Sequence, residues 1–316
     1  MKKLAVTFSP LTTERLQKIK NAAPNFEVLP LSPKDEQLLD CEVIFGQISP
    51  KLFNQPNKIK WLHTQSSGVN FLLTPDVSLP EELLLTNSAG AYGLGISEHL
   101  LTVTMMLLRQ MSGYHEKQKA HDWSDIGKLK TIHGSTVTIV GLGDIGGHFA
   151  KHCKNLGATV RGVVRTPRTI LPENVDALFT VDELDKAING ADVVVLSLPG
   201  TNETQHLFNH KRLGKMKKGA ILLNVGRGNA IDTEALIEHL KSGQIGGAGL
   251  DVTDPEPLPI SHELWDLPNV VLTPHISGND SLDITHDLIV DKFVRYLQDY
   301  LDGKPFEKTV DKKAGY

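Results

Sequence analysis

A run of mostly apolar residues, STVTIV (135–140), passes directly into the glycine-rich segment GLGDIG (141–146) and then into GHFAKHCKNLG (147–157). This order predicts a β-strand, a tight turn and an α-helix, which is a repeating unit of parallel sheets covered by helices. The continuous apolar runs VVVLSL and AILLNV further downstream predict strands that are buried on both faces. Together these features predict an α/β fold with doubly wound parallel sheets.

The strand candidates form two series that are separated by a long helical segment. They lie at residues 3–8, 26–29, 42–46, 59–64 and 83–86, and then at 136–140, 159–164, 192–198, 220–225, 247–252 and 270–273. Because 316 residues are also long for one domain, we expect two Rossmann-like domains with a cleft between them. The helix predicted at 282–301 should return to the first domain. The expected division is 1–97 plus 281–316 for a substrate domain and 98–280 for a dinucleotide-binding domain.

The segment from Ser97 to Gln118 predicts one long helix, with Ser97 as its N-cap. Apolar residues cover much of its surface, so we expect it to be buried in a core or against another subunit.

Composition excludes several classes of function. The net charge of −4 and the lack of a clustered basic stripe argue against a nucleic-acid partner. The apolar run near 100–108 is too short to span a bilayer, and the N-terminal segment is typical of a first strand rather than a signal peptide. Two cysteines cannot form a disulfide scaffold. We therefore expect a cytoplasmic protein without a metal site, since His148, His152 and Cys153 lack a further ligand nearby.

The glycine turn predicts a dinucleotide site. Gly141 permits the tight turn, Gly143 allows close approach of a pyrophosphate, and Gly146 lets the helix pack against the strand. Asp144 and Ile145 complete the turn, where Asp144 is interpreted mainly as a turn former. The helix N-terminus offers unpaired amides to the phosphates.

The end of the next strand predicts which dinucleotide binds. NAD sites usually place a carboxylate there for the ribose hydroxyls, but this strand ends in Arg165-Thr166-Pro167-Arg168. The two guanidinium groups and the Thr166 hydroxyl suit a 2′-phosphate, so we expect NADP(H), with NAD(H) also possible. The alternative is that Arg165 and Arg168 form a solvated surface pair.

Three chemically active residues follow consecutive predicted strands. Arg227 lies in NVGRG, Glu256 in DPEP and His275 in TPHISG. The carboxyl ends of parallel strands meet at one edge of a sheet, so these side chains should converge. An arginine can hold the carboxylate and carbonyl oxygens of a 2-keto acid. A histidine can donate the proton, and a neighbouring carboxylate stabilises the imidazolium. We therefore predict Arg227, Glu256 and His275 as catalytic residues.

The motifs GLGDIG, NVGRG, LDVTDPEPLP and LPNVVLTPHISG, in this order and spacing, resemble those of the D-isomer-specific 2-hydroxyacid dehydrogenases. The resemblance covers essentially the whole chain and is strongest over 133–279. Within the family, the sequence most resembles the glyoxylate/hydroxypyruvate-reductase-like branch. The resemblance implies reduction of a small 2-keto acid to a D-2-hydroxy acid, with the catalytic roles given above.

The same resemblance implies further contacts. The cofactor would contact Leu198, Pro199 and Thr204 in a loop beneath the adenosine and phosphates. Val225 and Gly226 would lie beside the nicotinamide, and Asp251 would contact the nicotinamide end. Thr204 would also start a helix. The segment SSGVN (66–70) matches the one whose amides bind the substrate carboxylate, which implicates Ser67, Gly68 and Val69; the alternative is a plain β-turn. Arg227 and His275 would also contact the substrate.

Two other functions remain open at this level. One is an NAD-dependent dehydrogenase of the D-lactate or D-2-hydroxyisocaproate type, and the other is a dinucleotide-sensing binding protein similar to the corepressors of this fold. The resemblance also implies a homodimer formed through the 97–123 region, with Trp123 contributed to a partner subunit.

Overall fold

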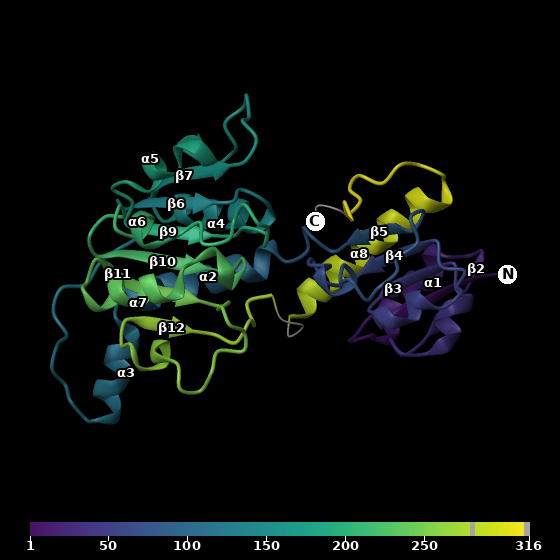
Figure 1. Ribbon diagram of the computed structural model, residues 1–316, viewed down its shortest axis with the longest axis horizontal. Coiled ribbons are helices and arrows are strands. Elements are labelled where there is room, and N and C mark those ends of the chain that lie inside the picture. The colour runs from purple at the N-terminus through teal and green to yellow at the C-terminus, as the bar shows by residue number, and fades with distance from the viewer. Residues whose placement is uncertain (279–281, 313–316) are drawn as a thin grey trace. The chain divides into compact units, whose positions relative to one another are not determined.

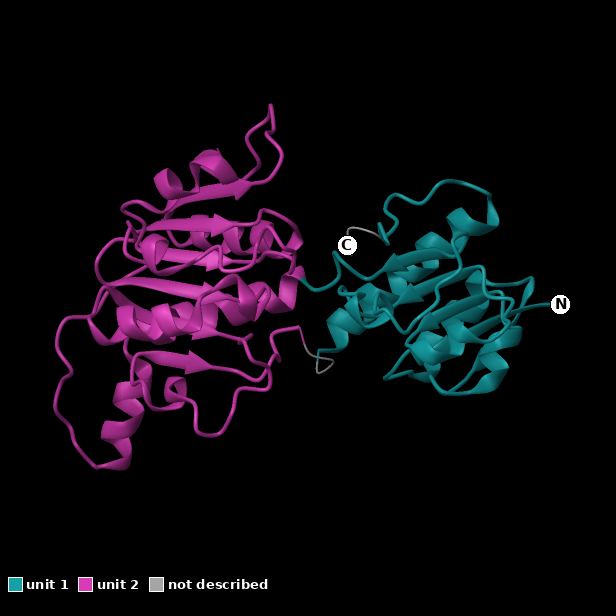
Figure 2. Ribbon diagram, in the orientation of Figure 1, with its two compact units in different colours: residues 1–92, 280–316 teal, residues 93–279 magenta. Residues whose placement is uncertain are grey.

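The computed structural model describes residues 1–278 and 282–312 and divides into two compact units (Figure 2). Unit 1 comprises residues 1–92 and 280–316, and unit 2 comprises residues 93–279. The division falls after residue 92 rather than after residue 97, because the helix that opens unit 2 begins at Gly93.

Unit 1 is built on a five-stranded parallel sheet in the order β2-β1-β3-β4-β5. The strands are β1 (Lys2–Thr7), β2 (Phe26–Pro30), β3 (Val43–Gly46), β4 (Trp61–Thr64) and β5 (Leu84–Asn87). The helices are α1 (Thr13–Ala22), α8 (Asp283–Leu301) and the short 3₁₀ segments η1 (Glu36–Asp40), η2 (Pro50–Asn54) and η3 (Asn70–Leu72). This strand order is that of flavodoxin-like folds.

Helices α1 and α8 pack together in unit 1 (Figure 1). Thr12 caps α1 by accepting a hydrogen bond from the Arg15 amide at 3.2 Å. The buried Arg15 side chain then donates to Asp283 and Asp287 of α8 at 2.9 Å each. The last helix is thereby attached to the first.

Unit 2 is built on a seven-stranded parallel sheet in the order β12-β11-β10-β9-β6-β7-β8. The strands are β6 (Thr136–Val140), β7 (Thr159–Val164), β8 (Ala177–Thr180), β9 (Val193–Leu196), β10 (Ala220–Asn224), β11 (Ile245–Leu250) and β12 (Val270–Leu272). This is the Rossmann order extended by one strand. The prediction of two doubly wound α/β domains is confirmed, although the sequence missed β8, a short edge strand with only three consecutive apolar residues.

Helices cover both faces of the unit 2 sheet. They are α2 (Gly93–Leu108), α3 (Met111–Lys119), α4 (Asp144–Asn155), α5 (Leu184–Ile188), α6 (His210–Leu213), α7 (Thr233–Lys241) and the 3₁₀ segments η4 (Val181–Glu183), η5 (Gly228–Ala230) and η6 (Glu263–Asp266). Helices α5, α6 and α7 contribute to one core with the sheet, and α2 and α4 pack against each other and the sheet.

The prediction of one long helix from Ser97 is wrong in two respects. The helix begins four residues earlier, at Gly93, and Ser97 is a buried residue of its first turns whose hydroxyl donates to the Leu94 carbonyl. It also ends at Leu108, because Gln110 adopts a left-handed conformation (φ 51°) and a separate helix, α3, follows. Much of the apolar surface of α2 is buried within unit 2, where Val103 and Leu107 lie against Gly249 of the sheet.

Among residues 1–278 and 282–312, none of the helices combines the length and the apolarity that crossing a membrane requires.

Candidate active site

The three predicted catalytic residues follow neighbouring strands at one edge of the unit 2 sheet. Arg227 comes after β10, Glu256 after β11 and His275 after β12, and these strands are adjacent and parallel. The carboxyl edge of a doubly wound sheet is the usual place for a ligand.

His275 and Glu256 are in direct contact. Nδ1 of His275 lies 2.6 Å from Oε1 of Glu256, and both side chains are close to half exposed, at 47% and 41%. The other ring nitrogen, Nε2, has no hydrogen-bond partner in the part of the chain that the structure describes. The carboxylate therefore orients the ring and leaves Nε2 available to exchange a proton.

The backbone of His275 is held in an unusual conformation. Its φ of 53° lies in the left-handed region that non-glycine residues rarely adopt. Its amide donates to the carbonyls of Asp251 at 2.9 Å and Thr273 at 3.0 Å. Such a conformation persists when the surrounding structure determines it, and here the surrounding contacts come largely from Asp251.

The buried carboxylate of Asp251 organises the loop that carries His275. It accepts hydrogen bonds from the Thr273 hydroxyl at 2.6 Å, the Ile276 amide at 2.9 Å and the Ser277 amide at 3.0 Å. Burial, the largest single effect, raises the pKa of Asp251, but the hydrogen bonds together bring it below its ordinary value. Asp251 is thus ionised, and the loop on both sides of His275 is tied to it.

Sequence analysis did not identify His99, which joins this network from α2. Its Nε2 lies 3.3 Å from the Thr273 hydroxyl, which itself donates to Asp251. Burial lowers the pKa of His99 despite the nearby Asp251. The only available signal was a histidine within an otherwise apolar helix.

Arg227 is positioned by Asn224, a second residue that sequence analysis missed. The fully buried Asn224 side chain donates to the Arg227 carbonyl at 2.9 Å and accepts from the Gly226 amide at 3.0 Å. The Arg227 guanidinium donates to the Gly226 carbonyl at 2.7 Å. A Cβ at Gly200 would lie 3.0 Å from Cγ of Arg227, so this glycine makes room for the arginine.

The structure brings the predicted loop at Leu198 and Pro199 to the segment at Val225 and Gly226. A Cβ at Gly226 would lie 2.5 Å from the Leu198 carbonyl oxygen, so only glycine allows this approach. Thr204, however, does not start a helix. It lies in a turn where its hydroxyl accepts from the Thr201 amide at 2.9 Å, and the next helix begins at His210 with Asn209 as its cap.

The glycine turn between β6 and α4 fits a dinucleotide. Gly141 has a φ of 101°, and a Cβ at Gly146 would lie 2.1 Å from the Gly141 carbonyl, so the helix packs closely against the strand end. A Cβ at Gly143 meets nothing within 4 Å, which leaves open space in front of the backbone at the α4 N-terminus. A pyrophosphate needs this open approach and these unpaired amides.

Asp144 has a structural contact of its own. Its carboxylate accepts a hydrogen bond from the Gly93 amide at 2.7 Å, and His148 lies 3.6 Å away. Asp144 therefore caps the start of α2 and joins it to the glycine turn. Its neighbour Ile145 is half-buried in the first turn of α4.

Arg165, Thr166 and Arg168 are exposed in the loop after β7. Arg168 donates to the carbonyl of Leu142 at 3.1 Å, which brings its guanidinium to the glycine turn. The loop therefore places a positive charge beside the candidate phosphate site.

In unit 1, the SSGVN segment follows β4 directly. The amides of residues 66–69 have no acceptor among the described residues, whereas the carbonyls of residues 64–68 all accept hydrogen bonds. Ser67, Gly68 and Val69 thus belong to a loop whose unpaired donors are amides. Val69 is buried and precedes η3.

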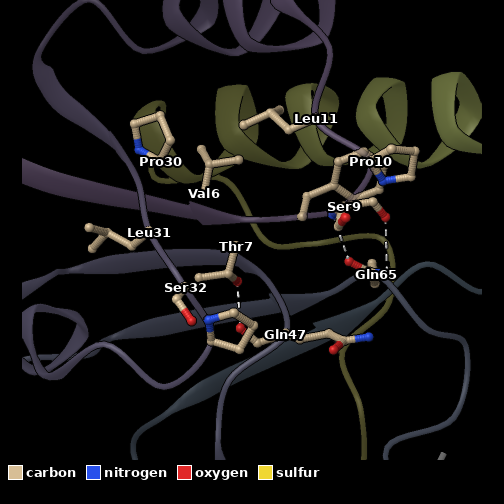
Figure 3. A pocket seen from close by; sticks show the side chains of 12 residues that line it. Val6, Thr7, Ser9, Pro10, Leu11, Pro30, Leu31, Ser32, Gln47 and Gln65 are labelled. Atoms are coloured by element: carbon tan, nitrogen blue, oxygen red, sulfur yellow. Dashed lines mark hydrogen bonds between the residues drawn. The ribbon is translucent and has the colours of Figure 1, made fainter.

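A hollow of roughly 700 Å³ lies next to this loop, at the carboxyl ends of β1, β2 and β3 (Figure 3). The residues that line it are uncharged and include Leu11, Ser32, Gln47 and Gln65. Gln65 and Ser9 are paired in its lining, where the Gln65 side chain accepts from the Ser9 amide at 3.3 Å and donates to the Ser9 carbonyl at 3.4 Å. Within residues 1–278 and 282–312, no group of three or more histidine, cysteine or acidic residues could hold a metal ion.

Comparisons with known proteins define the class to which this fold and site belong. A model of the D-isomer specific 2-hydroxyacid dehydrogenase NAD-binding domain matches residues 101–277. The glyoxylate/hydroxypyruvate reductase B of Escherichia fergusonii is 30% identical, over 96% of this chain and 97% of that protein. The protein is therefore an NAD(P)-dependent oxidoreductase.

Solved structures agree. A D-isomer specific 2-hydroxyacid dehydrogenase family protein from Aeromonas salmonicida has a TM-score of 0.85 and 32% identity, with 98% of this chain and 99% of that chain covered. The NADPH-dependent glyoxylate/hydroxypyruvate reductase of Sinorhizobium meliloti, in complex with NADP and sulfate, has a TM-score of 0.83 and 27% identity, with both chains covered completely at 100%. The chain belongs to the D-isomer-specific 2-hydroxyacid dehydrogenase family, and the predicted resemblance to its glyoxylate/hydroxypyruvate reductase branch is confirmed.

Proposed function

We propose that this enzyme reduces a small 2-keto acid, such as glyoxylate or hydroxypyruvate, to the D-2-hydroxy acid with NADPH. The observation that carries the proposal is the His275–Glu256 pair, 2.6 Å apart at the edge of the sheet where Arg227 follows the next strand. The names of the E. fergusonii and S. meliloti relatives support the choice of substrate.

The catalytic roles follow from the chemistry of the three side chains. Arg227 holds the substrate's carboxylate and carbonyl oxygens, which orients the carbonyl and draws electron density toward its oxygen. NADPH, when bound, would supply the hydride that the carbonyl carbon accepts. His275 donates a proton from Nε2 to the carbonyl oxygen, and Glu256 stabilises the ring while it is charged. One hydride and one proton convert the ketone or aldehyde into a hydroxyl group, and oxidation reverses both transfers.

The substrate's carboxylate also needs donors on unit 1. The unpaired amides of the loop that contains Ser67, Gly68 and Val69 supply them, because amides without a protein acceptor favour an anion.

The cofactor contacts extend along the carboxyl edge of the unit 2 sheet. The glycine turn and the α4 N-terminus would hold the pyrophosphate, with Asp144 and Ile145 placed in that first turn. The remaining contacts lie farther along the edge: Leu198, Pro199 and Thr204 for the adenosine and phosphate side, and Val225, Gly226 and Asp251 for the nicotinamide side. Asp251 keeps acceptor capacity for this role, since a carboxylate has about four acceptor positions and three are used.

A preference for NADPH over NADH rests on the loop after β7. Arg165, Thr166 and Arg168 stand where NAD-specific sites carry a carboxylate, and Arg168 contacts the glycine turn. Guanidinium groups bind a phosphate monoester with charge-assisted hydrogen bonds. The NADP bound by the S. meliloti relative supports this preference.

A homodimer would form through α2, α3 and the segment that follows. Trp123 lies on this segment and is completely exposed, and Met111 at the start of α3 is half exposed. Large exposed apolar side chains on one segment are typical of an interface. Molar mass by light scattering at several protein concentrations tests this proposal, and a monomer throughout would contradict it.

The function is tested by initial rates with glyoxylate, hydroxypyruvate, pyruvate and 2-ketoisocaproate, each with NADPH and with NADH. Preference for NADPH and one of the first two acids is the expected result. Preference for NADH with pyruvate or 2-ketoisocaproate would instead support an enzyme of the D-lactate or D-2-hydroxyisocaproate type. Tight cofactor binding without turnover of any acid would favour a dinucleotide-sensing binding protein.

A further inference from the structure

Five consecutive carbonyl groups in unit 1, at residues 64–68, are all oriented by hydrogen bonds. Two of the donors are hydroxyls within the loop, namely Thr64 to the carbonyl of residue 66 at 3.0 Å and Ser66 to that of residue 68 at 2.8 Å. The other three donors come from the end of β5 and from the segment that follows it. Ser88 donates to the Thr64 carbonyl at 2.9 Å, Asn87 to that of residue 67 at 2.8 Å, and Tyr92 to that of residue 65 at 2.5 Å.

This arrangement explains why the amides of the loop are available to a ligand. When successive carbonyls point toward protein donors, the intervening peptide planes are fixed, and their amides have no protein acceptor among the described residues. A carbonyl lies in the same peptide plane as the amide of the next residue. The Asn87 side chain, on the carbonyl of residue 67, therefore orients the amide of residue 68, and the Ser88 amide, which donates to the carbonyl of residue 66 at 3.2 Å, orients that of residue 67.

His63 lies directly behind Ser88 and is fully buried. Its Nδ1 is 2.7 Å from the Thr86 hydroxyl and its Nε2 is 3.2 Å from the Ser88 hydroxyl. The rings of Phe45, Trp61, Phe293 and Tyr296 surround it. Burial first, and the nearby Lys292 second, lower its pKa to about 3, so the imidazole is neutral at physiological pH.

The ends of this hydrogen-bond chain determine its direction. The Trp61 indole can only donate, and it donates to the Thr86 hydroxyl at 2.9 Å. The Thr64 carbonyl can only accept, and the Ser88 hydroxyl donates its single proton to it. His63 must therefore donate from Nε2 to Ser88.

The other ring nitrogen of His63, Nδ1, accepts a hydrogen bond from the Thr86 hydroxyl. Every polar group in this series of hydrogen bonds has a partner. Reversing the direction of any one of these bonds would leave a buried donor or acceptor unpaired.

We propose that His63 is a positioning residue for the substrate loop: as a neutral imidazole protonated at Nε2, it holds the Ser88 hydroxyl on the Thr64 carbonyl, where the loop begins. Ser88 is thereby kept in place to donate its amide to the carbonyl of residue 66, which keeps the loop amides ready for the substrate's carboxylate. This role rests on the proposed function of the loop. His63 does not touch the substrate, and it acts through Ser88 and the backbone.

The protonation state is tested first, because it needs no variant in the loop and no turnover. Nitrogen NMR of protein labelled at histidine, with the His63→Gln spectrum for assignment, is recorded from about pH 5.5 to 8. The expected signal is that of a neutral ring protonated at Nε2 across the whole range. A ring protonated at Nδ1, or one that titrates within this range, would overturn the proposal.

The effect on the loop is tested with Ser88→Ala, which removes the group between His63 and the Thr64 carbonyl. We expect the KM for glyoxylate to rise about tenfold, the fold change that corresponds to one lost hydrogen bond. The kcat and the KM for NADPH should stay near their wild-type values. The matched control is Ser135→Ala in unit 2, because Ser135 is also buried and also donates to a backbone carbonyl, that of Ile132 at 2.7 Å.

Two kinetic results would contradict this role. One is an unchanged KM for glyoxylate in Ser88→Ala. The other is a fall in kcat together with a rise in both KM values, which indicates a general loss of folded structure. Failure of the wild-type enzyme to reduce any keto acid is a separate result, since it would refute the proposed function, while the NMR measurement would still decide the state of His63.

Discussion

The two sheets of this enzyme are both parallel, yet they present different chemistry at their carboxyl ends. In unit 2 the candidate functional groups are side chains, namely Arg227, Glu256 and His275, each after its own strand. In unit 1 the candidate groups are backbone amides of residues 66–69, and the side chains nearby serve to orient carbonyls. Side-chain chemistry is visible in a sequence, whereas the direction of a peptide plane is not.

A second difference lies in the buried group behind each functional segment. The loop of His275 is tied to an ionised carboxylate, Asp251, and the loop of residues 66–69 is tied through Ser88 to a neutral imidazole, His63. Both groups are almost completely buried. A charged anchor binds several amides strongly, and a neutral anchor avoids the cost of burying a charge beside aromatic rings.

Replacing His275 with glutamine should remove proton donation and lower kcat by about 10²- to 10⁴-fold. The dissociation constant for NADPH, measured by fluorescence titration, should change little because the glycine turn is untouched. His210→Gln is the matched control, since His210 also lies beside a carboxylate, Glu238, at 3.4 Å and is exposed. A variant of His275 with wild-type kcat would remove the acid–base role and leave unit 2 with binding functions only.

Replacing Asp251 with asparagine should lower kcat/KM by about 10- to 100-fold, which corresponds to losing charged hydrogen bonds of about 1.5–3 kcal/mol. In the wild type, the Ile276 and Ser277 amides and the Thr273 hydroxyl all donate to the Asp251 carboxylate. The side-chain NH₂ of asparagine would place a donor among these donors. Steady-state kinetics and thermal unfolding measure the two consequences. If Asp251→Asn kept full activity, a charged anchor behind His275 would not be required.

Replacing Arg168 with alanine should lower kcat/KM for NADPH about tenfold and leave that for NADH unchanged, because only NADPH carries the extra phosphate. Arg295→Ala is a control for a lost surface arginine, since Arg295 forms an exposed ion pair with Glu307 at 3.0 Å in unit 1. Equal losses with both cofactors would show that Arg168 supports the glycine turn through Leu142 rather than reading the phosphate.

Acid should weaken unit 1 more than unit 2, where His99 also has a lowered pKa but is only partly buried. His63 is neutral in the folded state, where its pKa is about 3, whereas the unfolded value is near 6.5. Protonation therefore favours the unfolded state, and stability should fall as the pH drops from about 6.5 toward 3, by up to about 1.4 kcal/mol per pH unit. The lowered pKa of Asp251 also makes stability fall on acidification, but its contribution is lost only below about pH 4.

Hydrogen exchange resolved by residue at about pH 6 and pH 5 measures this difference. Protection of β1, β3 and β4 should decrease while that of β9 and β10 is retained. His63→Gln, which has no titrating group at this position, should flatten the pH dependence in unit 1. Equal losses in both units would show that the acid sensitivity does not originate at His63.

Much of the fold follows from local patterns in the sequence. Continuous apolar runs predicted β9 and β10 because both faces of these strands are covered, and the glycine turn predicted the β6–α4 unit. The edge strand β8 has only a short apolar run, Ala-Leu-Phe. At the edge of the sheet its four residues are only half-buried, so a longer run is not required. The break between α2 and α3 was also missed, because it depends on one left-handed residue, Gln110, whose side chain carries no turn signal.

The candidate site shows the same limit. The sequence contained the residues of the His275–Glu256 pair, because a proton donor and a carboxylate are recognisable types after strand ends. Asn224 and His99 were missed, since an asparagine at a strand end and a histidine in an apolar helix have many roles, and only their contacts distinguish them. The turn at Thr204 was wrongly predicted as a helix start, because its hydroxyl caps a single turn that does not continue.

The class of fold, the glycine turn and the chemical types at the ends of β10, β11 and β12 are predictable from local sequence, because each depends on a short segment with strong conformational or chemical preferences. The tertiary structure alone decided which groups hold those residues in place. Asp251 reaches across to the loop of His275, and Trp61, Thr86, His63 and Ser88 form one directed chain to the Thr64 carbonyl. Such networks join residues from different strands, and their donors and acceptors become unambiguous only when burial removes water as an alternative partner.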